Sequence, residues 1–292
     1  MDLIDTHQHL ILRDRLGYGW TAGFPALAGD FTRADYASLA QGVTATIFME
    51  TGVDDADYQA EARLVAGMVG TSVGGVAMLG QIASIRPEVD EGFDAWLEEA
   101  ATLGTVGFRR ILHVVPDEVS GAETFRKNLR KIGRAGYPFD LNLLSRQLLP
   151  VGVPLLEACP DQTVVLDHCG VPDVAAGDWE VWRAGIDRLA VFPNLVVKLS
   201  GITAYAAPGT ATTALLRPYV DHLLTAFGPD RMLWGSDWPV VNLGVGGSDW
   251  PVVNLGVGLP EWIVMTGELL AGLSEGERAA ISAGTARRVY GV

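Results

Sequence analysis

Short runs of β-branched and other apolar residues alternate with longer amphipathic segments along the whole chain. The predicted strands cover residues 3–5, 43–50, 75–84, 106–113, 139–143, 163–168, 194–200 and 231–235. The predicted helices cover about 32–42, 57–68, 93–103, 122–135, 148–158, 179–190, 213–227, 260–271 and 275–290. Strands that alternate with helices indicate a parallel sheet with helical crossovers. Eight such units predict a closed sheet, that is, one α/β domain folded as a (β/α)8 TIM barrel over residues 1–292.

The chain length supports one barrel. A (β/α)8 barrel typically needs about 250 residues. This chain has 292 residues, of which 49% are apolar and can fill a large core. No G-x-G-x-x-G sequence follows the first predicted strand, so a dinucleotide-binding fold is disfavoured.

The charge balance narrows the range of partners. With 35 acidic and 21 basic residues, the chain has a formal net charge of −14, which would repel a nucleic acid. No apolar stretch approaches the roughly 20 residues needed to span a bilayer. We therefore expect a small-molecule substrate and neither a nucleic-acid nor a membrane partner. Homodimers are common among barrels of this size, and that frequency is the only ground for expecting one here.

Two features favour a cytoplasmic location. The chain has two cysteines, Cys159 and Cys169, which imply no disulfide framework and suit a reducing compartment. The first predicted strand begins near Asp2, which leaves no room for a signal peptide.

A tandem duplication follows the last predicted strand. Residues 235–246 and 247–258 are the same twelve residues, GSDWPVVNLGVG. This length is not the period of a repeat fold, and the barrel needs one copy only. The first copy directly follows Met232-Leu233-Trp234, which favours Asp237 as the residue at a strand end. In the reverse register VNLGVG would be the strand and Asp249 the functional residue, and the sequence leaves this alternative open.

The strongest signal for chemistry is Asp5-Thr6-His7-Gln8-His9, directly after the first apolar run. Residues two apart in a strand share a face, so His7 and His9 are predicted to point together into the barrel mouth. Two imidazoles placed in this way can bind a divalent metal or flank a substrate oxygen. The alternative interpretation is two unrelated histidines near the N-terminus.

Two further candidates end predicted strands, where barrel enzymes place their chemistry. His168 ends the run VVLDH, in which Asp167 is predicted to face the other way and to fix local structure. Asp237 follows the eighth strand, where a carboxylate can bind a metal or accept a proton from water. The alternatives are a hydrogen-bonded core histidine and an aspartate in a turn before Pro239.

Arg109 and Arg110 lie in the fourth predicted strand, GFRRILH. A buried arginine needs an anionic partner, and strand alternation sends one of the two inward. Arg109 shares its face with His113, so we expect Arg109 in the pocket, holding a substrate carboxylate or polarising a carbonyl. The alternative is an internal salt bridge with Glu50 or Asp140. The full set of candidate substrate-binding residues is Arg109, Arg110, His113, Glu50, Asn142, Lys198 and Trp238, with a lysine that reaches solvent as the alternative for Lys198.

The chain resembles the amidohydrolase superfamily over nearly its whole length. DTHQH resembles the first-strand H-x-H of that family, VVLDHCG the strand with its later histidine, and LWGSDWP its eighth-strand aspartate. The tail LSEGERAAISAGTARRVYG is similar to the closing helix pair, although Thr285 stands where the family usually has asparagine. GFRRILH and VVKLSG resemble the branch that contains sugar-lactone lactonases and 2-pyrone-4,6-dicarboxylate lactonase.

The resemblance implies a hydrolase that opens a small lactone with an activated water. His7, His9, His168 and Asp237 match the metal-binding positions, and Asp237, His168 and Arg109 are the catalytic candidates. Two-metal relatives bridge their ions with a lysine on the fourth strand, where this chain has arginines, and no histidine ends the fifth strand. We therefore expect one divalent ion of the Zn²⁺ type, with metal-free catalysis as the open alternative.

Two other functions remain. Relatives on this fold decarboxylate small aromatic or enol carboxylic acids around an obligatory metal. A barrel that binds a small molecule without catalysis is the other alternative, because the duplication beside Asp237 could displace the site.

Overall fold

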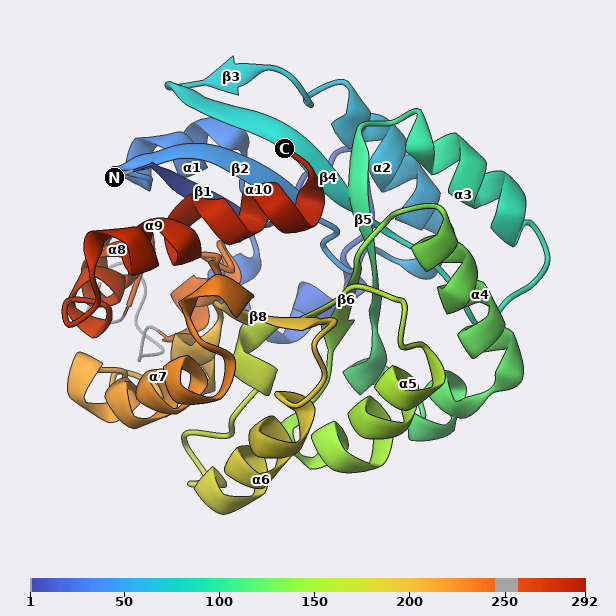
Figure 1. Ribbon diagram of the computed structural model, residues 1–292. Coiled ribbons are helices and arrows are strands. Elements are labelled where there is room, and N and C mark those ends of the chain that lie inside the picture. The colour runs from blue at the N-terminus through green and yellow to red at the C-terminus, as the bar shows by residue number, and fades with distance from the viewer. Residues whose placement is uncertain (1, 245–256) are drawn as a thin grey trace.

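Eight parallel strands pair side by side around a barrel in the computed structural model, which describes residues 2–244 and 257–292 (Figure 1). The parallel strands are β1 (Leu3–Gln8), β2 (Val43–Met49), β4 (Val76–Ser84), β5 (Thr105–Ile111), β6 (Phe139–Asn142), β7 (Val164–Leu166), β8 (Leu195–Leu199) and β9 (Met232–Trp234). The short strand β3 (Ser72–Val73) pairs antiparallel with β4 and was not predicted. The (β/α)8 barrel expected from the sequence is confirmed.

Hydrogen bonds between β1 and the chain around β9 close the barrel. The Thr6 hydroxyl donates to the carbonyl of Trp234 at 2.7 Å. Beyond β9, the Asp237 amide donates to the carbonyl of His7 and the His9 amide to the carbonyl of Trp238, each at 2.8 Å. The first and last predicted site segments are therefore joined through their backbones.

Ten α-helices lie within the described ranges, and most of them surround the strands (Figure 1). They are α1 (Arg33–Leu39), α2 (Tyr58–Ala66), α3 (Phe93–Ala101), α4 (Glu123–Arg134), α5 (Val153–Ala158), α6 (Trp179–Leu189), α7 (Thr213–Phe227), α8 (Leu259–Leu269), α9 (Glu275–Ala279) and α10 (Thr285–Tyr290). The predicted helix start at Thr32 is confirmed, because Thr32 and Asp35 form a reciprocal capping box. None of these helices combines the length and apolarity that crossing a membrane requires.

Apolar side chains fill the barrel at the end that carries the chain termini. There Ile4, Ile47, Val165 and Leu233 form a buried cluster with Tyr290 of α10. Figure 1 shows α10 crossing this end of the barrel. A larger cluster packs the helices onto the outer face of the strands. The polar residues of the barrel interior are consequently grouped toward the carboxyl ends of the strands.

The last strand of the barrel directly precedes the first copy of the duplicated segment. Met232–Trp234 forms strand β9, so Asp237 follows a strand as predicted. Asp249, the alternative, lies outside the described residues.

Candidate active site

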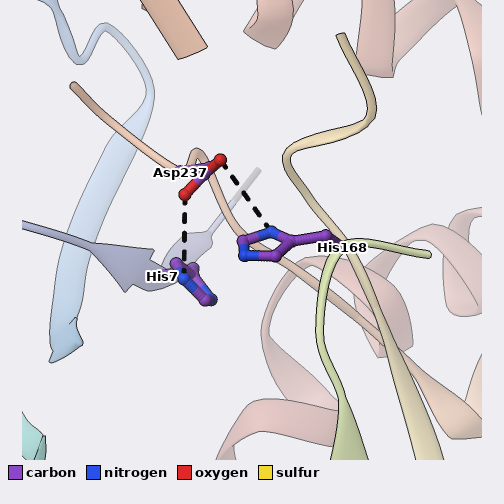
Figure 2. A group of neighbouring side chains, drawn as sticks. All are labelled: His7, His168 and Asp237. Atoms are coloured by element: carbon purple, nitrogen blue, oxygen red, sulfur yellow. Dashed lines mark ion pairs between the residues drawn. The ribbon is translucent and has the colours of Figure 1, made fainter. Parts of the chain in front are cut away.

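Three histidines and one aspartate meet at the carboxyl ends of β1, β7 and β9. The Asp237 Oδ1 atom lies 3.3 Å from Nε2 of His9 and 3.7 Å from Nε2 of His7. The other oxygen of Asp237 lies 3.9 Å from Nδ1 of His168. Figure 2 shows the Asp237 carboxylate facing the rings of His7 and His168. All four side chains are buried, and they form one cluster.

The ring centroids confirm that the sequence motifs converge in space. His7 lies 4.9 Å from His9, as expected for residues two apart on β1. His7 lies 4.3 Å from His168, although 161 residues separate them in the chain.

Unusual backbone conformations build two of the loops at the site. Among the described non-glycine residues, positive φ angles occur at His168, Cys169, Val171 and Asp237. Such angles cost free energy, which the surrounding structure must offset, and they often mark functional sites. All four residues belong to the turns that present His168 and Asp237.

Gly201 gives these two side chains room. Its φ is +64°, and a Cβ atom there would lie 2.4 Å from Nδ1 of His168 and 3.0 Å from Oδ2 of Asp237. A residue with a side chain would therefore displace both groups. Gly201 was not among the predicted site residues, and the Ser200-Gly201 pair after the strand VVKL was the available signal.

Hydrogen-bond partners orient the two histidines of β1. His9 Nδ1 lies 3.0 Å from the carbonyl of Met49, an acceptor, which assigns the proton to Nδ1 and a lone pair to Nε2. His7 Nδ1 lies 3.3 Å from Asp167, and Arg109 donates to His7 Nε2 at 3.2 Å. Burial lowers the pKa of His7 well below its ordinary value and also lowers that of His168. Burial therefore favours the neutral form of both rings.

Asp167 faces the barrel interior, so the prediction that it points away is wrong. Strand β7 ends at Leu166, and the left-handed turn at His168 (φ 52°) breaks the alternation, which lets both residues face inward. Asp167 lies 3.2 Å from Nζ of Lys198 and 3.5 Å from Nη1 of Arg109. Burial alone would raise the pKa of Asp167, but the charge of Lys198 and the adjacent His7 hold it well below its usual range.

A buried polar chain continues from Asp167 to the closed end of the barrel. Lys198 pairs with Asp140 and donates to the carbonyl of Thr6 at 3.1 Å. The Tyr290 hydroxyl donates to Asp140, with oxygen distances of 2.9 and 3.2 Å. The C-terminal helix is thereby connected to His7 through Asp140, Lys198 and Asp167. Neither Asp167 nor Tyr290 was a predicted site residue, and no spacing in the sequence signals their contacts.

Arg109 forms the internal ion pair that was the alternative to substrate binding. Its Nε donates to Glu50 Oε1 at 2.6 Å, and its Nη2 donates to the Glu50 carbonyl at 2.5 Å. Burial would raise the pKa of Glu50, but Arg109 and the Gly52 amide outweigh that effect, so the pKa is lowered. Arg109 nevertheless lies on the cavity wall, where it also contacts His7.

A cavity of about 630 Å³ opens above the cluster. Its lining includes His9, Glu50, Arg109, Arg110, His113, Asn142, His168, Tyr205 and Asp237. Arg110, a predicted substrate-binding residue, also lines the cavity at the end of β5, so both arginines reach it, whereas strand alternation predicted only one of them to point inward. His113 Nδ1 is paired with the side-chain oxygen of Asn142.

Two predicted substrate-binding residues do not line this cavity. Lys198 is fully buried beneath it in the ion pairs with Asp140 and Asp167, because its stem runs inward from β8. Trp238 is buried against Phe31 and Tyr36, with ring centroids 5.5 and 5.4 Å away. Tyr205, which was not predicted, does line the cavity.

The donor set fits one divalent ion. His7, His168 and Asp237 each offer a ligand atom, and these atoms lie within 4.8 Å of one another. The assigned lone pair of His9 Nε2 faces Asp237 Oδ1 across 3.3 Å, an arrangement that is repulsive unless a proton or cation lies between the two atoms. Imidazole and carboxylate groups are zinc ligands, and the acceptors on the opposite ring nitrogens of His7 and His9 match the usual outer support of such ligands.

The fold and the site together define a (β/α)8 barrel with a histidine–aspartate centre at the carboxyl ends of its strands. The sequence profile of the amidohydrolase family matches residues 4–246, and the chain belongs to that family.

The chain is similar to two lactonases and to an amidohydrolase of known structure, among other proteins. An L-fucono-1,5-lactonase of Burkholderia ambifaria is 29% identical over 250 residues, which cover 82% of this chain and 81% of that protein. An L-fucono-1,5-lactonase of Burkholderia multivorans is 28% identical over 306 residues, which cover 98% and 95%. A crystal structure of an amidohydrolase from Burkholderia multivorans with bound zinc has a TM-score of 0.85 and 25% identity, and the match covers 100% of both chains.

Proposed function

We propose that this protein hydrolyses a small lactone to its hydroxy acid. The observation that carries the proposal is the Asp237 carboxylate, which lies within 3.9 Å of three imidazoles on the wall of a cavity large enough for a small ring. The relatives described as lactonases, which cover most of the chain, support the same reaction class.

Asp237 serves as the general base. The attacking water forms a bond to the lactone carbonyl carbon and gives its proton to Asp237. The bond between that carbon and the ring oxygen then breaks, and the proton passes from Asp237 to the ring oxygen, which becomes a hydroxyl. His168 lies on the opposite side of the carboxylate, with its Nδ1 atom 3.9 Å from Asp237 Oδ2 and 3.1 Å from the Ser200 hydroxyl.

Arg109 acts from the cavity wall. Its guanidinium places a fixed positive charge beside His7 and the region where negative charge develops on the carbonyl oxygen. Because its ion pair with Glu50 is buried, this charge keeps one orientation throughout the reaction.

A single Zn²⁺ ion suits the same cluster. His7, His9, His168 and Asp237 would hold it, and the bound ion would supply Lewis-acid polarisation and a lowered pKa for water. The zinc in the related amidohydrolase structure supports this choice of ion.

The test is a pH-indicator assay on a set of lactones, with the wild-type protein and Asp237→Asn. Proton release from the lactone by the wild type, and its loss in the variant, would support the proposal. Dialysis against a chelator followed by added Zn²⁺ shows whether turnover needs the ion. Release of CO2 from an aromatic carboxylic acid without lactone turnover would instead identify a decarboxylase. Binding without any turnover would indicate a non-catalytic barrel.

A further inference from the structure

We infer that the substrate is an uncharged lactone with an apolar substituent. The inference rests on the proposed lactone hydrolysis and specifies which lactones the cavity accepts. Two properties of the cavity carry it, namely the pairing of its arginines and the composition of its rim.

Each arginine on the cavity wall already has an acidic partner. The pairs are Arg109 with Glu50 at 2.6 Å, Arg110 with Glu88 at 2.7 Å, and Arg86 with Asp55 at 2.8 Å. No other arginine or lysine lines the cavity in the part of the chain that the structure describes. The wall therefore offers no uncompensated arginine or lysine charge to a substrate anion.

The hydrogen-bond donors of two of these arginines are also used within the protein. Arg86 Nη1 donates to the Ser84 hydroxyl at 2.8 Å and to the carbonyl of Ile85 at 3.1 Å. Arg109 donates to Glu50 and His7. At Arg86 and Arg109 a substrate carboxylate would have to displace an existing partner and leave it without its cation, which is costly in a buried site.

The rim of the cavity is apolar. Trp20, Phe24 and Val114 all line it, and their exposed fractions are 37%, 42% and 66%. The Trp20 indole donates to the carbonyl of Thr51 at 3.0 Å, so its single polar atom is already paired. The rings of Trp20 and Phe24 lie 6.2 Å apart and form one wall. Large exposed apolar side chains grouped at a cavity mouth favour an apolar ligand group.

Several polar groups on the cavity wall already have hydrogen-bond partners within the protein. The Thr51 hydroxyl donates to the carbonyl of Leu10 at 3.0 Å, and the Ser84 hydroxyl accepts from Arg86. The Asn142 oxygen is paired with His113. The hydroxyls of a polyhydroxylated lactone would compete with these internal partners, which penalises binding.

The experiment compares four lactones with the purified full-length protein. These are δ-decalactone, with an alkyl chain; δ-valerolactone, without a substituent; D-glucono-1,5-lactone, with hydroxyls; and 2-pyrone-4,6-dicarboxylate, with two carboxylates. We expect kcat/KM for δ-decalactone to exceed that for δ-valerolactone by about 10-fold or more, because an apolar pocket discriminates by this order. The other two should fall below δ-valerolactone. A preference for either of them over δ-decalactone would overturn the inference.

A binding measurement separates failure of the proposed hydrolysis from failure of the inference about the cavity. If no lactone is hydrolysed, ligand-observed NMR measures binding of δ-decalactone and D-glucono-1,5-lactone directly. Stronger binding of δ-decalactone would then support the apolar cavity while lactone hydrolysis is rejected. Equal or weaker binding would overturn both.

Substitutions at the cavity test which residues cause the preference for an apolar lactone. Phe24→Ser should reduce the ratio of kcat/KM for δ-decalactone to that for δ-valerolactone, whereas Val191→Ser, at an exposed residue outside the cavity lining, should not. Glu88→Gln removes the partner of Arg110 and should raise kcat/KM for the dicarboxylate. An unchanged ratio in Phe24→Ser together with no gain in Glu88→Gln would contradict the assignment.

Discussion

The Nδ1 atom of His7 lies 3.3 Å from the Oδ1 atom of Asp167, and neither side chain is exposed to solvent. An acceptor beside Nδ1 favours the tautomer with the proton on that nitrogen, and His7 Nε2 then accepts from Arg109 at 3.2 Å, with Asp237 Oδ1 3.7 Å away. This pair links the reacting end of the site to the ionic chain beneath it.

Asp167→Asn should impair both activity and zinc binding. The substitution removes the negative charge that orients His7, and the loss of such outer support typically costs about 10–100-fold. Steady-state kinetics and a zinc titration measure the two effects. Asp187→Asn is the matched control, because Asp187 forms a His–Asp pair with His222 at 2.9 Å, away from the cavity. Equal behaviour of the two variants would refute an orienting role for Asp167.

Gly201→Ala should abolish most activity while the barrel still folds. Its Cβ would lie 2.4 Å from His168 Nδ1, so the ring must move away from Asp237. A misplacement of this size can cost about 10²-fold in rate. Gly177→Ala places a side chain at a similar positive φ of +72° but meets no atom within 4 Å, so it should retain activity. Loss of activity in both variants would point to backbone strain as the cause.

Tyr290→Phe should lower the free energy of unfolding by about 1–2 kcal/mol, because the buried Asp140 loses a hydrogen-bond donor. Urea unfolding followed by circular dichroism measures the change. Tyr137→Phe should have little effect, since no hydrogen bond of the Tyr137 hydroxyl is found among the described residues. Equal stability of wild type and Tyr290→Phe would show that this contact is not stabilising.

Glu61 makes the stability fall with rising pH. Burial, followed by the nearby charge of Glu50, raises the pKa of Glu61 from 4.5 to about 8. Between these values the folded state keeps a proton that the unfolded state releases, so the free energy of unfolding decreases as the pH rises through this window.

Glu61→Gln should remove that dependence. The amide oxygen can still accept the Thr51 N–H that Glu61 accepts at 3.0 Å. Melting temperatures should therefore be similar for variant and wild type near pH 5 and higher for the variant at pH 9. A difference that stays constant from pH 5 to pH 9 would exclude the titration of Glu61 as its cause.

Period-two and helical patterns predicted the fold well because they record which side of each element is buried. They placed β2 and α7 almost to the residue, as shown by Val43–Met49 and Thr213–Phe227. The H-x-H pattern also predicted that the rings of His7 and His9 lie together, and their centroids are 4.9 Å apart although His9 follows the last residue of β1.

The wrong predictions of side-chain direction concern residues at the ends of strands, where the alternation of inward and outward side chains stops. Asp167 and His168 both face inward because the chain leaves the strand with a left-handed turn, which no residue pattern announced. Lys198 was expected to reach a cavity or solvent, but two carboxylates from other strands hold it inside the barrel. Such contacts depend on strand neighbours far apart in the sequence, so one chain read in order does not reveal them.

A comparison of Asp237→Asn with Asp249→Asn decides whether the carboxylate after β9 is the base. Both aspartates lie in identical GSDWPVVNLGVG segments, so the two substitutions are matched in local sequence. We predict that kcat/KM for a hydrolysed lactone falls by about 10²–10⁴-fold in Asp237→Asn, as expected for loss of a general base, and stays at the wild-type value in Asp249→Asn. Wild-type turnover in Asp237→Asn, or a loss confined to Asp249→Asn, would contradict the assignment of Asp237.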